Sequence, residues 1–123
     1  YANSEAEAEF NYADSVKEAE MFIYSSGSIE TPLEIELIPK NTMNDITITH
    51  IESGYSMRIT DTLLTKPATL IVDTKAGTVR RGAYNAINTF SGQFLTAQPG
   101  ENTYKFTGAA GTIKIRWRDR WLA

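Results

Sequence analysis

The sequence contains no cysteine and only one histidine among its 123 residues. Without cysteine the chain has no disulfide, no thiolate metal site and no cysteine nucleophile, so packing alone must stabilise the fold. Long hydrophobic runs are lacking too, because no apolar stretch approaches the roughly 18 residues of a membrane-spanning helix. The first residues also lack the basic and then apolar order of a signal peptide. We therefore expect one soluble, non-secreted domain that does not associate with membranes.

An excess of positive charge is lacking as well, because 12 Lys and Arg stand against 15 Asp and Glu, for a net charge of −3. Proteins that bind nucleic acids need basic patches that displace counterions from phosphates, so we expect no nucleic-acid partner. The charge is uneven: residues 1–30 are strongly acidic, whereas residues 114–123 carry Lys114, Arg116, Arg118 and Arg120. We interpret the two ends as neighbouring edge strands that neutralise each other. A basic docking patch is the alternative.

What the sequence does contain is an alternation of apolar and polar residues with a period of two, the pattern of strands with one face in a core. In residues 33–37, Leu and Ile alternate with Glu34 and Glu36. Gly, Pro, Asn and Asp fall between such runs, as in the Pro99-Gly100 turn. Many strands with no long segment of period 3.6 indicate an all-β sandwich or barrel. We predict at least eight strands, at residues 21–25, 33–37, 45–51, 56–60, 69–73, 78–81, 102–107 and 112–118.

The first twenty residues fit two structures. Alternation of Ala and Phe10 with Glu and Asn favours a strand, whereas the high content of Ala and Glu, with Ser4 and Glu7 as a capping box, favours a helix. We predict a strand here. The compact domain is expected to begin near Glu18.

Candidate catalytic and ligand-binding groups are few. His50 ends a predicted strand on its apolar face, and no cysteine or second histidine offers a metal-ligand spacing, so we predict a partly buried, hydrogen-bonded histidine. Glu34 and Glu36 share a strand face at a spacing that suits glycoside hydrolysis, but their alternation with apolar residues favours a solvated outer face. No G-x-S-x-G, P-loop or G-x-G-x-x-G motif occurs. We therefore expect no catalytic, metal-binding or cofactor-binding residues, and no enzyme.

The two tryptophans are expected to differ in role. Trp117 shares the parity of Ile113 and Ile115, so we place it in the core. Trp121 follows the basic residues and is expected to be partly exposed. Tryptophan and arginine are enriched at interface hot spots. We therefore propose a partner-docking surface of Arg116, Arg118, Arg120 and Trp121, which would contact either a protein or a sugar.

Short motifs in the C-terminal part follow one another in an order that resembles the distal tail proteins of siphoviruses. They are Thr69-Leu-Ile-Val-Asp-Thr74, Val79-Arg-Arg-Gly82, Ser91-Gly-Gln-Phe-Leu95, Gln98-Pro-Gly-Glu-Asn102 and Ile113-Lys-Ile-Arg-Trp-Arg118. Upstream, Ser25-Ser-Gly-Ser28 is similar to the family's Asn-Pro-Gly-Thr, although two serines stand in place of Asn-Pro. The likeness covers about residues 20–122. The order of the motifs carries it more than any one of them.

The resemblance implies an antiparallel β-sandwich of the galectin-like or jelly-roll type that follows an N-terminal belt domain. It also implies that the belt domain builds a hexameric ring, which joins the tail tube to the tip or baseplate of the virion and is assembled in the host cytoplasm. We accordingly expect residues 1–17 to be a linker or the last strand of that belt domain, and residues 18–123 to be the sandwich. The fragment itself is expected to be monomeric or weakly associating, and to derive from a phage or a prophage.

On this hypothesis the chain is a structural docking module, and its partners are other tail and baseplate proteins. The alternative is a module that binds carbohydrate of the host cell wall. The sugar-binding residues of true galectins do not transfer to this chain, because His50 is followed by Ile-Glu-Ser and Trp117 by Arg-Asp-Arg. A shared fold does not by itself imply a shared function.

Overall fold

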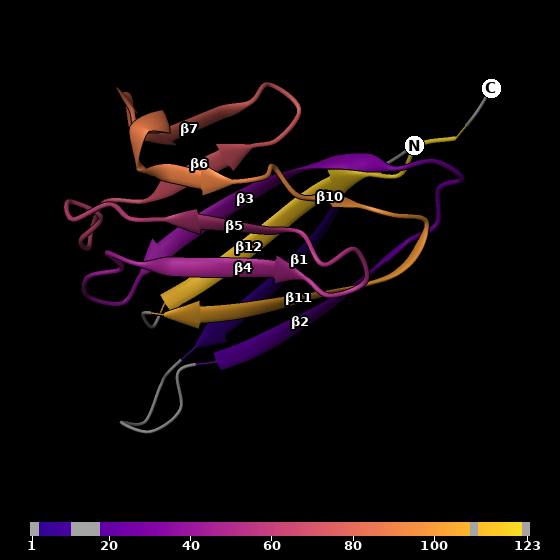
Figure 1. Ribbon diagram of the computed structural model, residues 1–123, viewed down its shortest axis with the longest axis horizontal. Coiled ribbons are helices and arrows are strands. Elements are labelled where there is room, and N and C mark those ends of the chain that lie inside the picture. The colour runs from indigo at the N-terminus through magenta and orange to yellow at the C-terminus, as the bar shows by residue number, and fades with distance from the viewer. Residues whose placement is uncertain (1–2, 11–17, 109–110, 122–123) are drawn as a thin grey trace.

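The computed structural model describes residues 3–10, 18–108 and 111–121 (Figure 1). These residues form two antiparallel sheets that pack face to face, which confirms the predicted all-β sandwich. A 3-10 turn, η1 (Ile87–Thr89), connects two of the strands. Within the described residues, no helix is long and apolar enough to cross a membrane.

The two sheets divide the strands unequally. The seven-stranded sheet has the order β1 (Asn3–Phe10), β12 (Gly111–Arg118), β3 (Thr31–Pro39), β6 (Leu70–Asp73), β7 (Thr78–Arg81) and β8 (Tyr84–Asn85), and β10 (Thr96–Ala97) also pairs with β3. The five-stranded sheet has the order β2 (Glu18–Ser25), β11 (Gly100–Gly108), β4 (Ile46–His50), β5 (Ser56–Ile59) and β9 (Phe90–Gly92).

The core lies between the sheets and follows directly from the alternation in the sequence. Along β3 the residues are buried and half-buried in turn, so that Ile35 and Leu37 are fully enclosed. From the opposite sheet, Ile48 and Phe106 are equally buried. Each such side chain contributes about 1.5 to 3 kcal/mol by leaving water, and the sum stabilises a chain that has no disulfide. Trp117, at 8% exposure, belongs to this core as predicted.

All eight predicted strands are present, with ends shifted by up to three residues. Three further strands, β8, β9 and β10, were not predicted, and each is only two or three residues long. A pattern with a period of two cannot be recognised in so few residues. Of the three, β10 pairs with the first two residues of β3, Thr31 and Pro32.

The N-terminal segment is a strand over Asn3–Phe10, which confirms the choice of strand over helix. This strand, β1, pairs along its whole length with β12 and forms the edge of the seven-stranded sheet. The sheet therefore extends beyond the range 18–123 expected for the sandwich. Whether β1 is a linker or the last strand of a belt domain stays a prediction, and residues 11–17 lie outside the described residues.

The acidic and basic ends of the chain meet in this pairing. The register places Glu5 opposite Arg116 and Glu7 opposite Lys114. The prediction that the two ends neighbour each other is therefore confirmed, although only β1 is an edge strand and β12 lies one position further in. Alternating opposite charges along an edge disfavour pairing with foreign strands.

Candidate functional site

Four segments meet at one end of the sandwich, on the right of Figure 1, and we call them the loop end. They are residues 26–30 between β2 and β3, residues 51–55 between β4 and β5, residues 93–99 around β10, and residues 119–121 after β12. Hydrogen bonds and a shared pocket connect these segments. The loop end is the candidate functional site.

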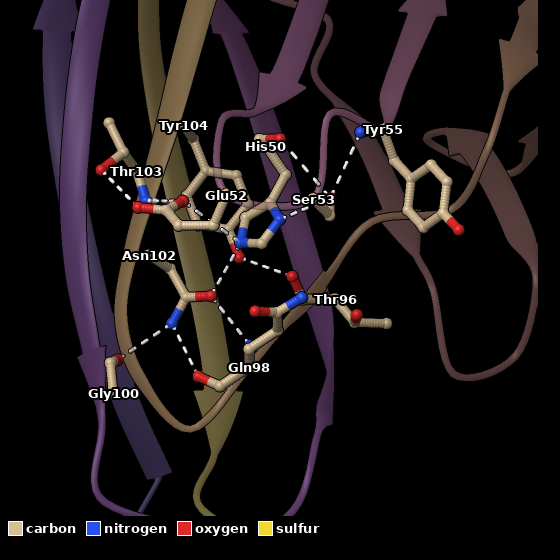
Figure 2. Close-up of polar contacts among 10 residues, drawn as sticks. All are labelled: His50, Glu52, Ser53, Tyr55, Thr96, Gln98, Gly100, Asn102, Thr103 and Tyr104. Atoms are coloured by element: carbon tan, nitrogen blue, oxygen red, sulfur yellow. Dashed lines mark hydrogen bonds and ion pairs between the residues drawn. The ribbon is translucent and has the colours of Figure 1, made fainter.

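Asn102 is the centre of a hydrogen-bond network in the loop end (Figure 2). Its side chain is fully buried. Its Nδ2 donates to the carbonyl oxygens of Gln98, at 2.8 Å, and Gly100, at 3.1 Å, while its Oδ1 accepts from the Gln98 amide at 2.8 Å. Gly100 has a φ of +91°, which only glycine adopts readily. The Pro99-Gly100 turn is thus closed by one buried side chain.

The same oxygen of Asn102 determines which nitrogen of His50 carries the proton. Oδ1 lies 2.7 Å from His50 Nε2, and because an amide oxygen can only accept, Nε2 must donate. The other ring nitrogen, Nδ1, lies 2.7 Å from Ser53 Oγ and accepts the hydroxyl proton when the ring is neutral. The prediction of a hydrogen-bonded histidine is confirmed, and at 2% exposure the residue is buried more deeply than expected.

Ser53, His50 and Asn102 have the connectivity of a nucleophile, a base and an orienting group. The remaining contacts of Ser53 indicate a turn instead. Its Oγ accepts the amide of Tyr55 at 3.2 Å, and the Gly54 amide donates to the His50 carbonyl at 2.8 Å. The His50 residue is only 2% exposed, so little of it is accessible to a substrate. We assign the network, which runs from Gly100 to Tyr55 in Figure 2, to holding the loop end in shape.

Glu52 attaches the β4–β5 loop to β11. Its two carboxylate oxygens accept the amide and the hydroxyl of Thr103, both at 2.8 Å, and Oε1 lies 3.6 Å from His50 Nε2. Partial burial raises the pKa of Glu52, but the hydrogen bonds from Thr103 outweigh it and leave the pKa below its ordinary value. Burial, and then the nearby charge of Glu52, raises the pKa of Tyr104. The Tyr104 hydroxyl therefore stays protonated and donates to the Thr96 carbonyl at 2.7 Å.

A pocket of about 150 Å³ opens beside this network. Three segments of the loop end form its wall, with His50 at its base. The polar and aromatic side chains of that wall are Glu30, Ser53, Tyr55, Gln93, Phe94, Thr96 and Gln98, and Leu95 adds apolar surface. Among the described residues, no group of three or more His, Cys, Asp or Glu is placed to hold a metal ion, here or elsewhere.

The C-terminal residues 119–121 are held against the β2–β3 loop. The Arg120 carbonyl accepts the amides of Ser28, at 2.8 Å, and Ile29, at 3.2 Å. A Cβ at Gly27 would overlap the backbone of Arg120, so only glycine permits this approach. The glycine of the Ser-Ser-Gly-Ser motif therefore has a tertiary role.

Two side chains complete this clamp. Asp119 Oδ1 accepts from Ser25 Oγ at 3.2 Å and from Trp117 Nε1 at 3.0 Å, which joins the C-terminal segment to the end of β2 and to the core. Thr31 Oγ1 donates to the Arg118 carbonyl at 2.6 Å. The segment that carries Trp121 is therefore fixed at several points.

The four residues predicted as a docking surface fall into two groups. Arg116 is half-buried on the outer face of the seven-stranded sheet, with its guanidinium nitrogens 3.0 Å from Glu34 Oε1 and 2.6 Å from Glu36 Oε1. Arg118, Arg120 and Trp121 lie at the loop end and are exposed, Trp121 at 49%. Arg116 thus contacts two carboxylates, whereas the other three residues are exposed, and Arg120 Nη1 donates to the Glu30 carbonyl at 3.5 Å. The contact with Arg116 also explains the paired glutamates without any catalytic role.

Sequence reasoning missed most of the loop end. Asn102, which follows the Pro99-Gly100 turn by two residues, offered a signal, since an asparagine just after a turn often bonds back to it. Tyr55, Gln93 and Gln98 offered none. They come from different loops without periodicity and meet only through the fold.

Comparison with known proteins gives a family and a fold. Residues 26–121 match the family described as the siphovirus-type tail component, C-terminal domain. The structure is similar to the crystal structure of the Dit protein (gp 19.1) of SPP1, described as a paradigm of the hub adsorption apparatus in phages that infect Gram-positive hosts. The TM-score is 0.71 at 9% identity, over 95% of this chain and 46% of that protein. This likeness shows a shared fold, and the chain spans less than half of that protein's length. No curated protein matches the chain.

Proposed function

Because the chain belongs to the siphovirus-type tail component family, we propose that it is a structural docking module of a phage tail tip. It contacts neighbouring tail or baseplate proteins through Arg118, Arg120 and Trp121 at the loop end. The observation that carries this proposal is the clamp on residues 119–121, formed by the Arg120 carbonyl and the Asp119 carboxylate. A surface fixed before binding loses less conformational entropy when a partner docks.

The types of exposed residue support the same role. Tryptophan and arginine are the side chains most often found at the centre of protein interfaces, and here they project from a rigid segment. The SPP1 protein is described as part of a hub adsorption apparatus. We propose that this chain serves as the C-terminal domain in a comparable hub of the virion, with a belt domain outside the chain supplying the hexameric ring. Its role is structural rather than enzymatic.

Binding measurements with the tail-tip proteins of the same phage test this proposal. A partner should bind the immobilised chain, and Trp121→Ala should weaken binding by about thirtyfold, which corresponds to about 2 kcal/mol for a hot-spot residue. Tyr84→Ala is the matched control, since Tyr84 is exposed to a similar degree but lies on β8. Equal losses in the two variants, or no loss in either, would contradict docking through Trp121.

The isolated chain is expected to be monomeric, because the ring is assigned to the belt domain. Light scattering on the purified chain tests this, and a stable hexamer would contradict it. Carbohydrate binding remains the alternative function. Trp121 is not among the residues that line the pocket of the loop end, so stacking of a sugar on Trp121 has less support than docking of a protein there.

A further inference from the structure

We propose that the pocket of the loop end is a subsite for a single pyranose ring of a neutral saccharide, with Tyr55 as its stacking platform. None of the docking residues Arg118, Arg120 and Trp121 lines the pocket, although Arg120 Nη1 donates to the Glu30 carbonyl at its edge, at 3.5 Å. The inference is tested with other variants than the proposed docking role. It rests on the size of the pocket, the chemistry of its wall and the rigidity of its base.

The size of the pocket limits the ligand to about one ring. Its volume is about 150 Å³. A cavity of roughly 150 Å³ holds a single six-membered ring, and when its lining is purely aliphatic it accepts benzene. Here the wall is mixed, with the aromatic rings of Tyr55 and Phe94 and several polar side chains, so the ring that fits must itself carry both apolar and polar surface.

The polar groups of the wall have hydrogen-bonding capacity to spare. The carboxylate of Glu30 and the side-chain amides of Gln93 and Gln98 make no hydrogen bond to any part of the chain that the structure describes. Each amide offers donors and an acceptor, and the carboxylate offers acceptors. Hydroxyl groups both donate and accept, so a polyol can satisfy all three. A few convergent polar groups beside apolar surface are typical of small-molecule sites.

Two aromatic residues line the wall, Phe94 and Tyr55. Phe94 is stacked on Phe90, whereas Tyr55 projects from the end of the network in Figure 2 and is 56% exposed. Its backbone amide donates to Ser53 Oγ at 3.2 Å, which holds the base of the side chain in place. The C–H groups on one face of a pyranose are apolar and pack against such a ring, while the hydroxyls point outward. Tyrosine serves this purpose well because it combines an apolar body with a polar tip.

The charges of the wall exclude other ligand classes. Glu30 is the one charged residue among the described residues that line the pocket, and no Lys or Arg lies among them. A phosphate or carboxylate ligand would meet repulsion from Glu30, and the nearby Arg120 guanidinium donates to the Glu30 carbonyl at 3.5 Å without lining the pocket. A metal ion would find a single carboxylate, too few ligands for a hard cation.

The base of the pocket is rigid, which favours binding of a small ligand. His50 and Ser53 are fixed by the Asn102 network, so they need not be ordered when a ligand enters. A preformed site loses less entropy on binding than a flexible one. A weak, millimolar affinity is the expected range for one ring, since each additional subsite would have to come from the neighbouring surface.

Nuclear magnetic resonance titration of the ¹⁵N-labelled chain tests the proposal. The probes are glucose, galactose, mannose and N-acetylglucosamine, each added to millimolar concentrations, and triglycine as a peptide of similar polarity. At least one sugar should shift the side-chain amide signals of Gln93 and Gln98 in a saturable manner. Tyr55→Ala should abolish these shifts, and Gln93→Ala should weaken the remaining shift of the Gln98 amide, with the dispersed spectrum of a folded domain retained in both variants.

Two control variants distinguish the pocket from the rest of the exposed aromatic surface. Tyr84→Ala removes an exposed tyrosine outside the pocket and should leave the shifts unchanged. Trp121→Ala should leave them unchanged as well, even where it abolishes binding of a tail protein. The proposal is overturned if no sugar shifts the pocket signals, if Tyr55→Ala responds like the parent chain, or if triglycine shifts the same signals more strongly than every sugar.

Discussion

Replacing Asn102 by alanine removes the centre of the loop-end network and should destabilise the whole domain. The substitution deletes four hydrogen bonds, two donated to the carbonyls of Gln98 and Gly100 and two accepted from the Gln98 amide and His50. At about 1 kcal/mol net for each bond, the loss amounts to about 4 kcal/mol. The buried His50 Nε2–H left without a partner adds to this cost. Against a total of roughly 5 to 15 kcal/mol for a small domain, the effect is large.

Urea unfolding followed by tryptophan fluorescence measures this change. The midpoint should fall steeply while the slope of the transition stays unchanged, which indicates a change of stability rather than of compactness. Asn85→Ala is the matched control, because its Oδ1 accepts a single exposed bond from the Ile87 amide, at 3.1 Å. The control should cost less than about 1 kcal/mol.

A double-mutant cycle assigns part of the loss to the contact between Asn102 and His50. The variants are Asn102→Ala, His50→Leu and the combination of both. Since the two side chains are in direct contact, the double variant should be more stable than the sum of the single losses predicts, by roughly 0.5 to 3 kcal/mol. Strict additivity, or a cost below about 1 kcal/mol for Asn102→Ala alone, would refute the network as described.

Three further predictions concern single contacts. Gly27→Ala should release the C-terminal segment, because a Cβ at this position overlaps the Arg120 backbone. The amides of Ser28 and Ile29, which donate to the Arg120 carbonyl, should then exchange faster with deuterium. Unchanged exchange rates of these amides would argue against the clamp. The pKa of Glu52 lies below its ordinary value of 4.5, so its carboxylate stabilises the fold in full above that pH and less as the pH falls through the folded-state pKa. The variant Glu52→Gln keeps a side-chain acceptor for Thr103 but has no carboxylate to protonate. Its melting temperature should therefore fall less at acid pH than that of the parent chain, and parallel pH profiles of the two melting temperatures would contradict this. Tyr104→Phe removes a buried hydroxyl that donates to a backbone carbonyl at 2.7 Å and should cost about 1 kcal/mol in urea unfolding, whereas a neutral effect would mean that the bond contributes nothing.

The sandwich could be predicted from the sequence because most of its strands are buried on one face only. One-sided burial leaves an alternating pattern, and β3 and β12 show it along their whole length. Trp117 could be placed in the core for the same reason. The order of strands in the two sheets could not be predicted, since β2, β11 and β4 are neighbours that lie far apart in the sequence.

The candidate site was predicted less well, because tertiary register determines it. The sequence contains both Arg116 and the glutamates, but only the pairing of β12 with β3, which sets Arg116 opposite Glu34, shows that the arginine is engaged. His50 could be predicted as hydrogen-bonded, yet its partner Asn102 is 52 residues away. The pocket wall comes from three loops, and loops carry no periodicity that would reveal which of them meet.

The motifs that carry the family resemblance have a common physical meaning at the loop end. Gly27, in the Ser-Ser-Gly-Ser motif, admits the backbone of Arg120, and Asn102, which follows Pro99-Gly100, closes that turn. Both requirements are geometric and accept few other residues, whereas the core accepts any apolar side chains of suitable volume in an alternating pattern. Exposed side chains such as that of Tyr55 are less constrained by packing. A tail protein built in this way can change its partner by exchanging exposed side chains while the frame that presents them stays the same.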